Sequence, residues 1–171
     1  MWSESAYLGP VTYDWVLTQA GNPSLTMKVW VEDNKRRYEF SQGRQEVIQL
    51  VDYDARIMYI YFPDQNMAYR TDFNQAPQRP IEESESLQQI QPTILGTETI
   101  DGKDCLVIEW ANENTVSKSW VWQDRKFPIR MEQVTPQGTT LMEWRNIQFG
   151  DISDSMFQLP PGVDIITLPS Q

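Results

Sequence analysis

The stretch that most clearly indicates the fold is LTMKVWVEDNKRRYEFS, residues 25–41. Apolar side chains alternate along its first half, at Leu25, Met27, Val29 and Val31. After the turn-forming pair Asp33-Asn34, Tyr38 and Phe40 again share one side of the chain. A period of two residues is the period of a β-strand, and Asp and Asn favour turns. This stretch therefore predicts a β-hairpin.

The same pattern recurs along the chain, with turn residues between the segments. Period-two or β-rich runs predict about eleven strands: Val11–Gln19, Leu25–Val31, Arg36–Ser41, Glu46–Val51, Arg56–Phe62, Met67–Thr71, Ile94–Ile100, Cys105–Ala111, Val116–Gln123, Ile129–Val134 and Thr139–Phe149. Twist accumulates from strand to strand, so an open sheet of that width is expected to curl. We therefore expect a mainly β protein, a curved antiparallel incomplete barrel, as one domain over residues 1–171 with its core at about 11–165.

The strand pattern is interrupted once, between Asp72 and Pro92. This segment has three prolines and the acidic run Glu82-Glu-Ser-Glu85. Pro suits the first turn of a helix, and Glu suits its positive end. We therefore expect a short helix at Ile81–Gln91, which would cross the open side of the sheet as a lid. A second helical stub or turn is expected at Asp151–Phe157.

Composition argues against several classes of function. The chain has 14 Lys and Arg, 24 Asp and Glu, no His and one Cys, and its formal charge is −10. A nucleic-acid partner needs clustered positive charge, and the usual zinc sites and catalytic triads need His or Cys. We therefore expect no nucleic-acid partner, no metal, no cofactor and no enzymatic activity. The many carboxylates leave a carboxylate-pair glycosidase as a further alternative, although no pair is marked.

Aromatic residues at alternating positions are the most informative feature for function. They fill the core of the sheet in one interpretation, and they line a cleft for an apolar ligand in the other. The second interpretation nominates eight ligand-binding residues on one strand face: Trp15, Met27, Tyr38, Phe40, Tyr59, Tyr61, Trp120 and Trp122. A one-residue bulge in a strand would turn the nominated side chains of that strand to the other face of the sheet. The sequence does not say which face is concave.

Several short motifs, in this order, resemble the LolA/LolB-like superfamily of bacterial outer-membrane lipoprotein carriers and its lipoprotein-sorting relatives. The matching pieces cover roughly residues 25–165: Val29-Trp-Val-Glu-Asp-Asn-Lys-Arg-Arg-Tyr-Glu-Phe40, Tyr59-Ile-Tyr-Phe-Pro63, Gly96-Thr-Glu98, Ile100-Asp-Gly-Lys-Asp-Cys105, Trp120-Val-Trp122, Phe127-Pro-Ile-Arg130 and Phe157-Gln-Leu-Pro-Pro-Gly-Val163. These pieces are structural, since they pair strands or form turns.

The resemblance implies an incomplete barrel with a helical lid over a hydrophobic cavity, and a protein that holds acyl chains without covalent chemistry. It places Tyr38 and Phe40 at the cavity. LolA has an Arg that ties down its lid shortly after the matching Trp-Val, whereas this chain has Glu32-Asp33 there. The resemblance therefore supports the strand scaffold more strongly than the carrier activity. The implied partner is a lipid acyl chain or a lipoprotein. The alternative is a protein-interaction or sensor domain like the RseB branch, which would use the sheet rim to bind another extracytoplasmic protein.

The resemblance also implies an extracytoplasmic location, in the periplasm or cell envelope, either free or lipid-anchored. The residues Met1-Trp-Ser-Glu-Ser5 lack the basic and apolar regions of a signal peptide. A signal sequence is therefore expected to be absent from this chain, with Met1 as a native start or as an addition to a mature form.

Overall fold

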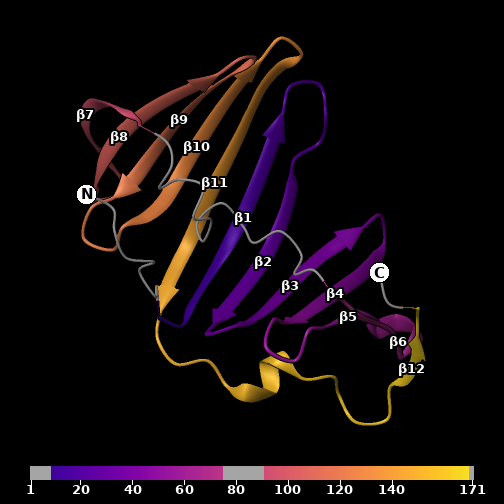
Figure 1. Cartoon of the computed structure of the whole chain (residues 1–171). Coiled ribbons are helices and arrows are strands. Elements are labelled where there is room, and N and C mark those ends of the chain that lie inside the picture. Colours follow the sequence, from indigo (N-terminus) through magenta and orange to yellow (C-terminus); the bar gives the residue numbers. More distant parts are fainter. Residues whose placement is uncertain (1–8, 75–90, 170–171) are drawn as a thin grey trace. The chain divides into compact units, whose positions relative to one another are not determined.

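A computed structural model describes residues 9–74 and 91–169 of the chain. Its twelve strands (Figure 1) are β1 (Val11–Gln19), β2 (Leu25–Glu32), β3 (Lys35–Gln42), β4 (Gln45–Asp52), β5 (Ile57–Phe62), β6 (Met67–Asp72), β7 (Thr93–Ile100), β8 (Lys103–Asn112), β9 (Thr115–Trp122), β10 (Phe127–Thr135), β11 (Gly138–Phe149) and β12 (Asp164–Thr167). Two short 3-10 helices, η1 (Pro63–Gln65) and η3 (Asp154–Phe157), complete the elements in these ranges. The described chain is therefore all-β.

All twelve strands belong to one open sheet in the order β12-β6-β5-β4-β3-β2-β1-β11-β10-β9-β8-β7. The pairs from β2–β3 to β5–β6 and from β7–β8 to β10–β11 are antiparallel. Among the strand pairs whose register is described, only β12 and β6 run parallel. The mainly β, antiparallel prediction is thus confirmed, and each of the eleven expected strands is present.

The strand β12 was not predicted from the sequence, because it has only four residues. All four residues of Asp164–Thr167 are exposed, so the segment has no alternation of buried and exposed side chains from which a strand could be recognised. Backbone hydrogen bonds to residues distant in sequence hold it beside β6. The Asp164 amide donates to the carbonyl of Asn66, and the Leu168 amide donates to the carbonyl of Arg70. The stub expected at Asp151–Phe157 is η3, whereas the expected helix at Ile81–Gln91 falls almost entirely outside the described residues.

Turn chemistry sets the hairpins. Asp101 and Gly102 have φ of 48° and 72°, the left-handed pair that a tight two-residue hairpin requires between β7 and β8. Pro63 begins η1 with its fixed φ, and Asn66 ends η1 in the left-handed region, which suits Asn. The Asn66 side chain also donates to the carbonyl of Gly162 at 2.8 Å, which ties the β5–β6 turn to the chain before β12.

The chain divides into two compact units. Among the described residues, unit 1 comprises 15–26 and 91–145, and unit 2 comprises 9–14, 27–74 and 146–169. Unit 1 contains β7 to β10 and most of β11, and unit 2 contains β3 to β6, β12 and both short helices. Each unit is described separately below, because each has its own two sheet faces.

Candidate binding faces

Strand register divides the side chains of unit 2 between two faces. Met27 pairs with Phe40, Val29 with Tyr38, and Phe40 in turn with Val47. Directly paired residues point to the same side of a sheet, so these residues share a face. Continued through β4 and β5, this side, called the Phe40 face, includes Met27, Val29, Val31, Arg36, Tyr38, Phe40, Val47, Gln49, Val51, Met58 and Ile60.

The Phe40 face is largely apolar, with one buried charged residue, Arg36, and it is only partly buried. Val29 and Val47 are in the core, at 1% and 3% exposed, whereas Met27, Tyr38 and Phe40 are half-buried. Gln49 in β4 donates through Nε2 to the sulfur of Met58. A face of this kind keeps apolar surface that a ligand can cover, with flexible Met side chains that adapt to its shape.

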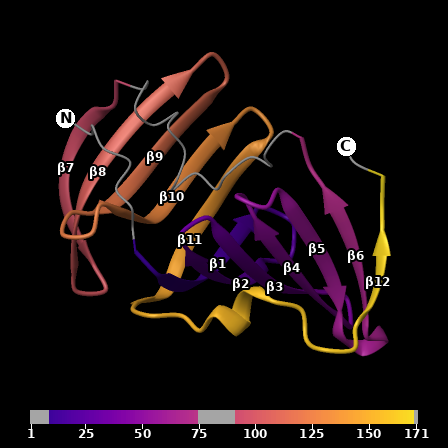
Figure 2. The same cartoon turned by 60° about the horizontal axis from the view of Figure 1, so that its bottom comes forward.

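The opposite side of the same strands, called the Tyr61 face, is packed against the end of the chain. Ile48, Leu50, Tyr61 and Ala68 form a buried cluster. Tyr59, Leu159 and Val163 pack against this cluster, so the chain between η3 and β12 covers part of the face (Figure 2).

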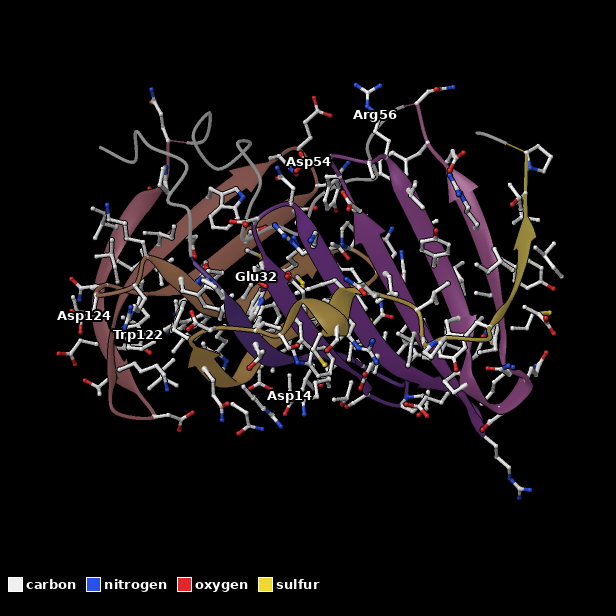
Figure 3. All side chains as sticks on the ribbon, turned by 90° about the horizontal axis from the view of Figure 1, so that it is seen from below. Asp14, Glu32, Asp54, Arg56, Trp122 and Asp124 are labelled. Carbon is white, nitrogen blue, oxygen red and sulfur yellow. The ribbon has the colours of Figure 1, made fainter. Side chains whose placement is uncertain are left out.

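Arg37 fixes this covering segment in place. Its Nη1 donates to the carbonyl of Met156 at 3.0 Å, and its Nε donates to Glu39 at 2.7 Å. The guanidinium also lies over the Trp30 ring, 5.5 Å from its centroid, and the Lys28 ammonium lies 5.2 Å from the same ring. Figure 3 shows the segment that contains η3 passing across β3 from this side. The Tyr61 face is therefore covered in part by the protein's own C-terminal segment.

Register separates the residues that the sequence groups together. Met27, Tyr38 and Phe40 lie on the Phe40 face, whereas Tyr59 and Tyr61 lie on the Tyr61 face, so these five do not line one cleft. The physical reason is the sequence Ile57-Met-Tyr-Ile-Tyr-Phe62, which is apolar on both sides of β5 and gives no alternation to orient it. The Phe40-face positions in β5 are Met58, Ile60 and Phe62, none of which was among the nominated ligand-binding residues.

Unit 1 also has two unlike faces. Trp120 pairs with Val107 and Arg130, and Trp122 pairs with Cys105 and Phe127, which defines the Trp120 face. Charged side chains surround both rings: the Lys118 ammonium and the Arg130 guanidinium lie 4.5 and 5.3 Å from the Trp120 centroid, and the Lys103 ammonium lies 5.5 Å from that of Trp122. Figure 3 shows Trp122 near Asp124 at the end of β9. This face therefore combines the buried apolar side chains of Cys105, Val107 and Phe127 with charged side chains around its two tryptophan rings.

The hydrogen bonds of the Trp120 face are local. The Trp120 indole N–H donates to the Glu98 carboxylate at 2.8 Å, and the ring is only 6% exposed. Cys105 is fully buried on the same side, and burial raises the pKa of its thiol. A protonated, inaccessible thiol is a poor nucleophile, so Cys105 is a packing residue. The binding role of Trp120 and Trp122 stays a prediction, as does that of half-buried Trp15 in β1.

The other side of unit 1 is an apolar core, called the Trp144 face. Met131 pairs with Met142 across β10 and β11, and with Ser119 across β9 and β10. The buried members of this face are Ile108, Ser117, Ser119, Val121, Met131, Met142 and Trp144. The alternation Met142-Glu-Trp144 was the available sequence signal for it.

Metal and membrane features are not found in the described chain. Within residues 9–74 and 91–169, no group of three or more His, Cys, Asp or Glu side chains is arranged to hold a metal ion. Over the same ranges, the structure has no helix of the length and hydropathy that a membrane span requires.

The fold is that of an open, mostly antiparallel twelve-stranded sheet protein. Two kinds of solved structure share its fold: an uncharacterised conserved protein from Thermus thermophilus (9% identity, 95% of this chain and 92% of that chain, TM-score 0.65), and MucB in its complex with MucA from Pseudomonas aeruginosa (14% identity, 93% and 58%, TM-score 0.59). A LolA superfamily protein from Nitrosomonas europaea is also similar (13% identity, 89% and 91%, TM-score 0.40). No protein-family model and no curated protein sequence matches the chain.

The likenesses to the Thermus protein and to MucB show a shared fold, in agreement with the resemblance that the sequence motifs suggested. MucB is a protein of the RseB type that the resemblance also implied. This chain spans 58% of the MucB chain in that complex, so the likeness concerns part of MucB only.

Proposed function

We propose that the protein is a non-enzymatic, extracytoplasmic binding protein that holds an acyl chain, from a lipid or a lipoprotein, against the Phe40 face of unit 2. The observation that supports this choice is the difference between the two faces. The Tyr61 face is packed against Leu159 and Val163. The Phe40 face keeps half-buried Met and aromatic side chains along neighbouring strands, at Met27, Tyr38, Phe40 and Met58.

Burial of hydrocarbon supplies the affinity. Each buried methylene contributes about 0.8 kcal/mol, so a chain of about ten covered methylenes gains about 8 kcal/mol before the costs of association. Tyr38 and Phe40 combine two independent lines of support, since strand alternation and the family resemblance both select them. Covalent chemistry is not part of the proposal.

The test is Phe40→Glu, with binding of the fluorescent fatty acid cis-parinaric acid as the measurement. A carboxylate on the apolar face should cost about 2 kcal/mol or more, which is roughly a thirtyfold loss of affinity. The matched control is Trp30→Glu on the adjacent strand and the opposite face, where Lys28 and Arg37 flank the new carboxylate. Unchanged binding by a folded Phe40→Glu protein would remove the Phe40 face as the site.

A second candidate function is a protein-interaction or sensor domain that uses the sheet rim. It is favoured by the likeness to MucB, which has been solved in complex with MucA(peri). The rim strands β7 and β12 expose the apolar side chains Ile94, Ile165 and Ile166, at 64%, 51% and 44%. Native mass spectrometry of the protein purified from its own host separates the two candidates: a co-purifying lipid supports the first, and a co-purifying protein supports the second.

The proposed location and the single-domain organisation over residues 1–171 follow from the family resemblance. Fractionation of the host tests the location, because an unmodified protein found in the cytoplasm would contradict it.

A further inference from the structure

The strand β12 is an edge of the sheet in unit 2, and half of its backbone groups point away from β6. It stands at one end of the strand order, and β6 is the only described strand that pairs with it. The amides of Asp164 and of Leu168, which follows the strand, donate to carbonyls in and next to β6. Because successive backbone groups of a strand point to opposite sides, those of Ile165 and Thr167 point to the open side. β12 therefore offers donors and acceptors that no described strand uses.

The other edge strand of the sheet, β7 in unit 1, shows how an edge is normally blocked. Its pairing with β8 is interrupted by a bulge between Ile94 and Gly96, where Gly96 has φ of 144°. Bulges are one of the devices by which natural proteins keep an edge strand from pairing with another chain. The pairing of β12 has no register shift, and its exposed side chains Ile165 and Ile166 point to opposite faces. The edge at β12 is therefore open to a further strand.

Charge indicates the class of partner that fits this edge. Asp164 begins β12, and Asp64 lies in η1, which ends at the residue whose carbonyl accepts from the Asp164 amide. Both carboxylates are exposed, and Figure 2 shows the turn that contains η1 at the start of β12. The basic residue of β6, Arg70, already forms an ion pair with Asp72 at 3.0 Å. This end of the edge is therefore acidic and attracts a basic segment.

A second copy of this chain is a poorer occupant of the edge. Each copy has a formal charge of −10, so two copies that pair through β12 bring like charges together. The pairing would extend over the four residues of β12 only, which gives few hydrogen bonds to offset the repulsion.

We propose that β12 is the docking edge for an extended, basic segment of a partner protein, which adds to the sheet as a further strand. This inference goes beyond the proposed acyl-chain binding and rests on the second candidate function, for which it names the strand, the mode of binding and the class of partner. The backbone of the segment bonds to Ile165 and Thr167, and these main-chain hydrogen bonds supply affinity. Ile165 and Ile166 contact apolar side chains on the two faces of the segment, and a Lys or Arg side chain of the segment reaches Asp64 or Asp164.

The test uses a fluorescein-labelled peptide, Lys-Val-Thr-Val-Thr-Val-Lys, and measures its affinity by fluorescence anisotropy. The same peptide with Glu in place of Lys is the control for charge, and it should bind at least about tenfold more weakly. Thr167→Pro removes an outward N–H that β6 does not use, and it should weaken binding of the basic peptide about tenfold. Thr167→Val keeps the N–H, and its affinity should stay within about twofold of that of the unmodified protein.

Amide hydrogen exchange keeps the inference testable if Thr167→Pro fails to fold. In the unmodified protein, the basic peptide should slow exchange at Ile165 and Thr167. Unchanged exchange there at about 1 mM peptide would overturn the inference, as would equal affinities of folded Thr167→Pro and Thr167→Val. Equal binding of the acidic peptide would overturn the assignment to a basic partner.

Two further measurements separate this inference from the alternatives. A dimer in sedimentation equilibrium that Thr167→Pro dissociates would overturn the inference by assigning the edge to a second copy. Binding of cis-parinaric acid should be the same in the unmodified protein and in both Thr167 variants. A failed peptide test therefore leaves the acyl-chain proposal in place, whereas failure of that proposal is seen with Phe40→Glu.

Discussion

Truncation of Tyr61 tests whether register, rather than aromatic character, decides the role of a side chain in this protein. Tyr61 is 8% exposed and belongs to the buried cluster with Ile48, Leu50 and Ala68, which Leu159 and Val163 help to cover. Tyr61→Ala removes a whole ring from a core that cannot fully close around the space. Such truncations of large aromatic side chains cost about 3–5 kcal/mol.

This loss is a large share of the typical stability of a domain, about 5–15 kcal/mol. Urea unfolding followed by circular dichroism measures it. With a slope of about 2 kcal/mol per molar urea, the midpoint should fall by roughly 1.5–2.5 M. Tyr61→Phe, which keeps the ring, should shift the midpoint far less. A loss below about 1 kcal/mol for Tyr61→Ala, the size expected at an exposed position, would refute the assignment of Tyr61 to a packed face.

Two further predictions concern the backbone and the C-terminal segment. Asn146, within β11, has φ of 53°, and its side-chain amide donates to the Asp14 carboxylate at 2.6 Å. Asn146→Ala should therefore lower the free energy of unfolding by about 1–2 kcal/mol. Asn146→Gly should lower it less, because glycine tolerates a positive φ. Urea unfolding measures the free energy of unfolding of both variants, and equal losses would show that the positive φ does not contribute. Arg37→Leu removes the hydrogen bond to the Met156 carbonyl, which holds the segment that contains η3. Limited proteolysis within residues 150–158 should therefore become several-fold faster. Lys35→Ala, which loses only a 4.0 Å exposed ion pair to Asp154, should not have this effect, and equal cleavage rates would contradict the role of Arg37.

The strands could be predicted from the sequence because their signals are local. Alternation at residues 25–31 and turn residues such as Asp101-Gly102 depend only on neighbours along the chain, and the structure has a strand or hairpin at each. The strand β12 could not be found, because four exposed residues pair with β6 only through hydrogen bonds from distant sequence.

The candidate site could be predicted only in part, for the same physical reason. The pairs Met27–Phe40 and Val29–Tyr38 are joined by a short hairpin, so their shared face follows from local alternation. The strand β5 is apolar on both sides, so its orientation depends on its pairing with β4. This pairing joins Tyr61 to Ile48 and puts Tyr61 on the face away from Phe40.

The central claim is that acyl chains bind the Phe40 face, and methyl NMR of methionine-labelled protein tests it most directly. Of the seven Met residues, Met27 and Met58 lie on the Phe40 face, whereas Met156 lies in the segment at the opposite face. Titration with palmitate should shift the Met27 and Met58 methyl signals and leave that of Met156 in place. Saturating palmitate that leaves Met27 and Met58 unshifted, or that shifts Met156 alone, would contradict the account.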